Sequence, residues 1–193
     1  MNFARAQRGS SSVEFAMVLP LLILFVLGII DAGRLMWSYN RAEKAAQMAA
    51  RYAAVTDMVP STLASTDFTL QANGAVVGGQ PVPTSAFSGT TCTSGSCSGP
   101  WGYNGTAFTN VVNRVRFFMP EVAAANVQIR YDNAGLGYAG DPNGPDVAPL
   151  ITVSLINLQF QPLVFRLFGR ASLPMPTVTA SVTGEDLSGT VSN

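Results

Sequence analysis

The N-terminal part of the chain contains one uninterrupted apolar stretch. Residues 15–30 include no charged side chain, and as a helix they measure roughly 24 Å at ~1.5 Å per residue. A hydrocarbon core of ~30 Å needs about 20 residues, and apolar neighbours on both sides lengthen the run. Asp31 and Arg34 interrupt it at a spacing of i, i+3, which lets the two charges partly neutralise each other. The pattern predicts one transmembrane helix.

The same helix is expected to continue through residues 38–56, which are rich in strong helix formers. Alanines recur there at four-residue intervals, and such small side chains form smooth ridges that let another backbone approach closely. We expect these ridges to pack on the chain's own globular part or on a neighbouring subunit. The proposed packing positions, two of them in or next to the apolar run, are Gly28, Ala32, Ala42, Ala46 and Ala50.

Beyond the helix, the pattern predicts a small α+β domain with antiparallel strands. Apolar residues at helical spacing indicate an amphipathic helix over residues 107–118, whose apolar stripe is assigned to the core. Short extended segments are expected at 67–71 and 75–77, and one helical turn or a membrane-proximal patch at 163–168. Stretches enriched in β-branched residues predict strands with one covered face. These stretches are residues 127–131, 150–160 and 176–183.

Composition then removes several classes of function. Hydrophobic residues make up 48% of the chain and charged residues 11%, and the formal net charge is 0, so no overall field attracts nucleic acid. The chain has no histidine, which excludes His-based triads and histidine zinc ligands. Lys44, the only lysine, lies on the predicted helix, and no Gly-rich phosphate loop is present. We therefore expect a protein that is not an enzyme, with no cofactor and no nucleic-acid partner.

Cys92 and Cys97 are the only cysteines and lie in a predicted Gly/Ser-rich loop, residues 78–106. Their spacing differs from the Cys-x-x-Cys of redox enzymes, and a zinc site needs more ligands than the chain offers. We interpret them as a local disulfide, which requires an oxidising compartment. The bulk of the chain is then expected outside the cytoplasm.

A second polar cluster lies in the Gly/Pro-rich stretch 132–146. Its carboxylates and amides are ligand types that Ca²⁺ accepts, but the EF-hand spacing is absent. Asn, Asp, Gly and Pro are also the residues that turns require. We expect no metal site here, and keep calcium as the alternative, with Asp141, Asn143 and Asp146 as its ligands.

Glu14 lies directly before the apolar run, where an ionised carboxylate needs a partner. Such a charge costs ~2.5–3.5 kcal/mol or more at mid-membrane, and less near an end. Cleavage between Gly9 and Ser10 would place a new α-amine four residues before Glu14, within one helical turn and within reach of an ion pair. Arg5 and Arg8 form a basic leader ahead of this position. Residues 5–14 therefore indicate a membrane anchor that is processed by cleavage.

Two other interpretations of the apolar run stay open. A cleaved secretory signal needs small residues just after the run, and no Ala-x-Ala-like pair lies between residues 30 and 40. A plain signal anchor needs no cleavage, and it leaves the position of Glu14 without a reason.

Several features follow one another in order across residues 11–55. They are Val-Glu-Phe-Ala at 13–16, Pro20 within the apolar run, acid-x-Gly-Arg at 31–34 and Ala-Arg-Tyr-Ala at 50–53. Cleavage after a basic leader, which leaves an acid as the fifth residue of the product, resembles the processing of type IV prepilins. The full order resembles the TadE-like family of minor pseudopilins in Tad (Flp) pilus systems. A looser match covers parts of the C-terminal strands.

This resemblance implies a division of the chain and a role. It implies a prepilin-type leader at 1–9, a transmembrane and extended helix at 10–56 and an extracytoplasmic domain at 57–193. Glu14, with Phe15 after it, would set the register between neighbouring helices during assembly.

The resemblance also implies a place in the cell and a set of partners. It implies a single-pass protein of the bacterial inner membrane that can join a pilus and supports surface attachment. Its partners would be prepilin peptidase, other pilins and pseudopilins, the inner-membrane pilus platform and membrane lipid. The alternative function is a signal-anchored extracytoplasmic domain for binding or adhesion.

Overall fold

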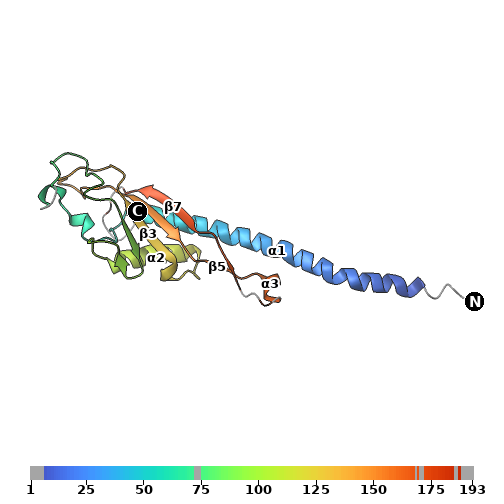
Figure 1. The fold of residues 1–193 in the computed structure, drawn as a ribbon. Helices are drawn as coiled ribbons and strands as arrows, with labels where there is room; N and C mark the ends of the chain where they lie inside the picture. The colour runs from blue at the N-terminus through green and yellow to red at the C-terminus, as the bar shows by residue number, and fades with distance from the viewer. Residues whose placement is uncertain (1–6, 72–74, 168, 170–171, 185–186, 188–193) are drawn as a thin grey trace, which may run out of the picture. The chain divides into compact units, whose positions relative to one another are not determined.

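The computed structural model describes residues 7–71, 75–167, 169, 172–184 and 187 of the chain (Figure 1). The chain divides into two compact units, one made of residues 1–39 and 159–175 and the other of residues 40–158 and 176–193. A long N-terminal helix precedes an antiparallel sheet with a shorter helix. The predicted α+β class is confirmed.

Helix α1 spans Gln7–Ala54, and its 48 residues supply segments to both units. Pro20 lies inside the helix, where it removes one backbone donor, and the helix continues past it. At the other end, the hydroxyl of Thr56 donates to the carbonyl of Tyr52 at 2.8 Å. The same carbonyl also accepts the N–H of Val55 at 3.3 Å, so this last-turn carbonyl is satisfied where the helix ends.

The first unit combines the N-terminal part of α1 with a short segment from late in the sequence. That segment contains β5 (Gln159–Phe160), α3 (Leu163–Leu167) and β6 (Leu173–Pro174). The two strands pair antiparallel, with Phe160 opposite Leu173. The segment therefore returns on itself as a strand pair that carries α3 in its connection.

The second unit contains a five-stranded sheet in the order β2-β1-β3-β4-β7, with every neighbouring pair antiparallel. Ile129 of β3 lies between Cys92 of β1 and Val153 of β4. Burial alternates along β3 and β4, as expected when one face of a sheet is covered. The strands are β1 (Thr90–Thr93), β2 (Ser96–Cys97), β3 (Val127–Asp132), β4 (Leu150–Leu155) and β7 (Val178–Thr183).

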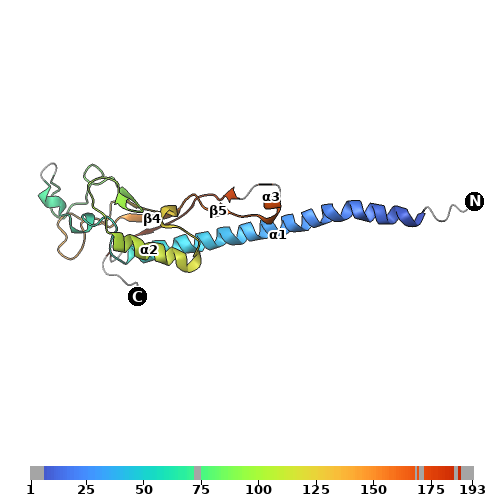
Figure 2. The same ribbon diagram turned by 90° about the horizontal axis from the view of Figure 1, so that it is seen from below.

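Two helical segments of the second unit lie on one side of β4, namely α2 (Gly105–Phe118) and the C-terminal part of α1 (Figure 2). The carboxamide oxygen of Asn104 accepts the first N–H groups of α2, as an N-cap residue does. Arg41 of α1 donates to the carbonyl of Phe118 at 2.6 Å. The predicted helix at 107–118 is confirmed, and its apolar stripe is buried.

The sequence predicted two short extended segments, at 67–71 and 75–77, and both predictions were wrong. Phe68–Leu70 forms a 3-10 turn, because the carboxylate of Asp67 accepts the N–H of Thr69 at 2.8 Å and caps it. Residues 75–77 form no strand, and the N–H of Val76 donates to the carbonyl of Phe68 instead. Further 3-10 turns are Leu63–Ser65 and Ala124–Asn126.

The composition of residues 150–160 predicted a single strand, but the structure divides this stretch into two strands. β4 ends at Leu155, and Asn157 adopts a φ of 54° before β5 begins. This left-handed conformation, which Asn tolerates better than most residues, breaks the extended backbone. The other predicted strands, 127–131 and 176–183, are confirmed as β3 and β7 within a residue or two at each end.

Candidate functional site along the N-terminal helix

The predicted cleavage position lies within the first turns of α1, which begins at Gln7. Ser10 and Glu14 are four residues apart in one continuous helix, so they lie on the same face, one turn apart. The side chain of Glu14 is exposed. Helical geometry therefore brings the carboxylate within reach of an amine created at Ser10. Arg5 of the predicted leader lies outside the described residues.

The apolar run of α1 is exposed along its length. Among the described residues, one helix is long and apolar enough to cross a membrane, over Ser11–Ala54, with a mean hydropathy of 2.7 and no buried residue in its most apolar window. A Cβ added at Gly28 would meet no atom within 4 Å, and Ala32 is likewise exposed. A water-exposed apolar surface of this size is rare in soluble monomers. The helix is therefore consistent with a membrane anchor or a signal sequence.

Asp31 is the enclosed charge at the end of this apolar run, and only 7% of it is exposed. One carboxylate oxygen accepts from the guanidinium of Arg34 at 3.0 Å, which confirms the predicted pair. The same carboxylate accepts the backbone N–H groups of Leu163 at 2.9 Å and Val164 at 2.8 Å. The guanidinium of Arg34 also lies 5.4 Å from the ring centroid of Phe160. Asp31 therefore fastens the first residues of α3 to α1.

The alanine ridge lies in the second unit. Ala42, Ala46 and Ala50 each have no exposed surface, and Ala45 and Ala49 on the neighbouring ridge are equally enclosed. Small side chains at these positions let the helix approach the rest of the unit closely. This part of α1 packs on the chain's own domain, which was one of the two surroundings expected for it.

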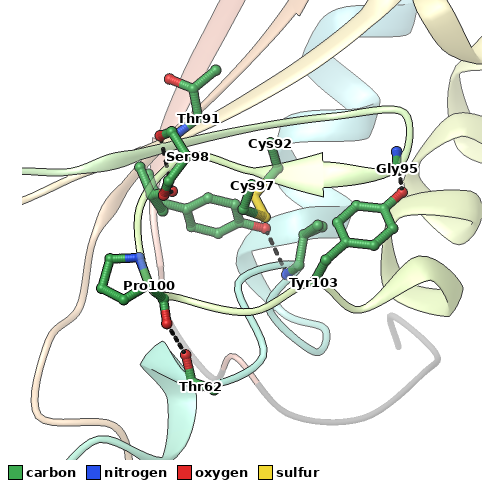
Figure 3. Close-up of a disulfide and its surroundings, with 11 residues drawn as sticks. Thr62, Thr91, Cys92, Gly95, Cys97, Ser98, Pro100 and Tyr103 are labelled. Atoms are coloured by element: carbon green, nitrogen blue, oxygen red, sulfur yellow. Dashed lines mark hydrogen bonds between the residues drawn. A yellow bond between two sulfur atoms is a disulfide. The ribbon is translucent and has the colours of Figure 1, made fainter.

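The cysteines form a disulfide, as predicted, between β1 and β2 (Figure 3). Cys92 and Cys97 are cross-strand neighbours in a hairpin, whereas the Gly/Ser-rich composition predicts a loop at this position. Gly95 turns the chain with a φ of 111°, and its N–H donates to the hydroxyl of Tyr103 at 3.1 Å (Figure 3). The Thr-rich string before the turn was the available signal for a strand.

The oxygen-rich stretch is organised around Asp146, which is buried. Its carboxylate accepts the N–H of Phe68 at 2.7 Å and the N–H of Asp141 at 3.1 Å. The carboxylate of Asp141 in turn accepts the N–H of Asn143 at 2.9 Å and raises the pKa of the nearby Tyr138 phenol. Within the described ranges, no three His, Cys, Asp or Glu side chains are grouped to hold a metal. Calcium binding stays a prediction for experiment.

Comparison with known proteins agrees with the N-terminal pattern. Residues 9–51 match the family model described as TadE-like protein. No curated protein and no solved structure matches the chain. The matched segment contains Glu14, the exposed apolar run, the Asp31–Arg34 pair and most of the alanine ridge. Over residues 9–51, the chain is thus similar to TadE-like proteins.

Proposed function

We propose that this protein is a minor pseudopilin of a Tad/Flp-type pilus assembly or secretion system. It is made in the bacterial inner membrane, cut by prepilin peptidase between Gly9 and Ser10, and assembles through α1 to support surface attachment. The observation that carries the proposal is the match of residues 9–51 to TadE-like proteins. Prepilin peptidase, other pilins and pseudopilins, the inner-membrane platform and lipid are its proposed partners.

The helical position of Glu14 supports the processing step. In the mature chain the new Ser10 amine would stand one turn from this carboxylate, and an opposite charge lowers the cost of placing the carboxylate at the membrane edge. The amine of a neighbouring subunit can fill the same place. Such a pair would fix the axial register of two adjacent helices, which is what an ordered assembly needs.

The exposed apolar run supports the proposal that α1 lies first in the membrane and later among other pilin helices. In the membrane, residues 15–30 would contact acyl chains. In a filament or tip complex, the same surface would pack on other pilin helices. Gly28, where an added Cβ would meet no atom, and the exposed Ala32 would let a neighbouring helix approach closely.

The disulfide supports the proposed location of the domain. Cys92 and Cys97 form their bond in the second unit, and structural disulfides persist in oxidising compartments. We infer that the domain lies outside the cytoplasm while residues 1–9 begin inside, where the peptidase acts.

The cleavage is tested by mass spectrometry of the protein purified from its own host. The expected mature chain begins at Ser10. A strain lacking prepilin peptidase should yield the full-length chain, and an intact leader in a strain with active peptidase contradicts the proposal.

The role of Glu14 is tested with Glu14→Gln, which keeps the shape of the side chain and removes its charge. Membrane insertion should be unchanged, while surface pili and attachment should be lost or strongly reduced. Glu43→Gln is the matched control, because Glu43 is also an exposed acid on α1 but lies outside the apolar run. Normal piliation with Glu14→Gln would make the carboxylate incidental.

Exchange of the anchor separates this function from a signal-anchored binding domain. Residues 11–39 would be replaced by an unrelated single-span helix, while residues 40–54 are kept because their alanines belong to the core of the second unit. Loss of assembly supports a pseudopilin. Full attachment with the foreign anchor supports the binding-domain alternative.

A further inference from the structure

The bonds at Asp31 fix the level of α3 along α1. The N–H groups of Leu163 and Val164 both end on the Asp31 carboxylate, and all three residues belong to the first unit. A third donor, Arg34, completes the set around this carboxylate. The first turn of α3 is thus held at the axial position where the apolar run of α1 ends.

That axial position corresponds to the edge of the hydrocarbon core. A membrane of ordinary thickness takes about 20 helical residues, and a span that starts at Phe15 therefore ends near Arg34. Trp37, one turn further on, is 60% exposed, and indole rings prefer the headgroup region. Asp31, and α3 with it, would lie where acyl chains give way to headgroups.

The exposed residues of α3 suit this boundary. Leu163 is 48% exposed on the turn that Asp31 holds, and the basic Arg166 is exposed one turn later. An apolar side chain beside a cation is the composition of segments that lie in the membrane interface, with the cation directed to lipid phosphates. The described residues of the first unit leave about half of Leu163 uncovered.

We propose that α3, carried by the β5–β6 pair, is a second membrane contact that lies in the headgroup boundary next to the transmembrane helix. Leu163 enters the acyl region, and Arg166 binds anionic headgroups. Asp31 acts as the positioning residue, because it fixes the start of α3 at this depth. The chain would then touch the bilayer at two points far apart in its sequence.

A bilayer fits this surface better than a protein groove for a specific reason. Leu163 is hydrogen-bonded to Asp31 at the end of the exposed apolar run of α1, and in this proposal that run lies in lipid before any assembly. The two backbone N–H groups and Arg34 satisfy Asp31, and a carboxylate satisfied in this way can lie at the membrane edge at reduced cost. The inference requires α1 to cross a membrane and does not depend on the pilus assignment or on cleavage at Gly9.

The test places a nitroxide label at residue 163 of the full chain in vesicles of phosphatidylethanolamine and phosphatidylglycerol. The variant is Leu163→Cys, and the native cysteines are joined in their disulfide and do not react. Leu136→Cys is the matched control, because Leu136 is 49% exposed in the second unit, away from α1 and α3 in sequence. Collision rates with oxygen, which concentrates in lipid, and with an aqueous nickel complex report the depth of each label.

The label at 163 should show a several-fold higher ratio of oxygen to nickel collisions than the label at 136. Vesicles of phosphatidylcholine alone should reduce the difference if Arg166 binds anionic headgroups. A nickel-accessible label at 163 overturns the proposal. A label shielded from both reagents also overturns it, because such shielding indicates a protein partner.

A second variant tests Asp31 as the positioning residue. Asp31→Asn removes the charge that attracts Arg34 and one of the acceptor sites for the α3 N–H groups, so the label at 163 should become shallower and more mobile. Asp132→Asn, which breaks the pair with Arg130 in the second unit, should leave that label unchanged. An unchanged depth with Asp31→Asn contradicts the positioning role. It leaves the pilus proposal untouched, since that proposal is tested at Ser10 and Glu14.

Discussion

The hydroxyl oxygen of Tyr131 accepts a hydrogen bond from the backbone N–H of Val59 at 3.2 Å. Tyr131 lies on the central strand β3 with no exposed surface, and Val59 lies in the segment that leaves α1. The bond joins the middle of the sheet to the chain just beyond the alanine ridge, within the second unit. It satisfies a backbone donor that is enclosed away from water.

Removing this hydroxyl should destabilise the second unit. Tyr131→Phe leaves the N–H of Val59 buried without its acceptor, which should lower the free energy of unfolding by about 1–3 kcal/mol. Urea unfolding in mild detergent, followed by near-ultraviolet circular dichroism, measures the change. Tyr103→Phe is the control, since its hydroxyl accepts the exposed N–H of Gly95 and its removal should cost much less. Equal losses in the two variants would contradict the role of burial.

The same tyrosine should make the protein sensitive to alkaline pH. Burial raises the pKa of Tyr131 above its ordinary value, so the folded state keeps a proton that the unfolded state loses near pH 10. The contribution to stability is complete below about pH 10 and is lost as the pH rises further, at up to ~1.4 kcal/mol per pH unit. Urea unfolding between pH 8 and pH 11 should show a steeper fall for the native chain than for Tyr131→Phe. Parallel curves would refute the linkage.

The disulfide should stabilise the domain. Closing so short a loop is worth about 2 kcal/mol in the loop-entropy model, so the double variant Cys92→Ala, Cys97→Ala should melt at a lower temperature. A reductant should lower the melting temperature of the native chain and leave that of the double variant unchanged. The protein taken from its host should carry no thiol that reacts under denaturing conditions. A reactive thiol in that material would argue against an oxidising location.

The sequence predicted best where one strong periodicity decides the structure. The apolar run, the helix that continues it and the amphipathic helix at 107–118 follow from side-chain spacing, which is a local property. The Asp31–Arg34 pair follows in the same way, because residues three apart on a helix are neighbours. The similarity of residues 9–51 to TadE-like proteins rests on the same local order of residues.

The contacts that complete the candidate site could not be predicted in this way. The backbone N–H groups that bind Asp31 belong to Leu163 and Val164, which lie 132 and 133 positions further along the chain. No pattern of residue types shows which distant backbone N–H group will reach a given carboxylate. The hairpin at Cys92 was missed because Ser, Thr and Gly also suit loops. The 3-10 turn at Phe68 depends on a single capping carboxylate, from Asp67, which competes with an extended reading of the same residues.

Substitution on the two parts of α1 should separate folding from assembly. Ala46→Leu inserts a larger side chain where no surface is exposed, and overpacking should cost about 1–3 kcal/mol of unfolding free energy. Ala32→Leu makes the same change at an exposed position of the same helix and should leave that stability unchanged. If Ala32 packs on a neighbouring helix, as proposed, this variant should still reduce surface pili. Normal piliation with Ala32→Leu would remove this position from the assembly surface.

Substitution of Asp146 tests whether the carboxylates of the acidic loop hold the backbone in place or bind a metal ion. Its carboxylate accepts two backbone N–H groups, from Phe68 and Asp141, so Asp146→Asn should lose about 1–3 kcal/mol of unfolding free energy because a buried donor is left with a poorer acceptor. Asp141→Asn should lose less, since its bond to Asn143 is exposed. Millimolar calcium should leave the melting temperature of the native chain unchanged if these carboxylates serve the backbone alone. A rise in melting temperature that disappears in both variants would instead identify them as calcium ligands, because a ligand that binds only the folded state raises its stability.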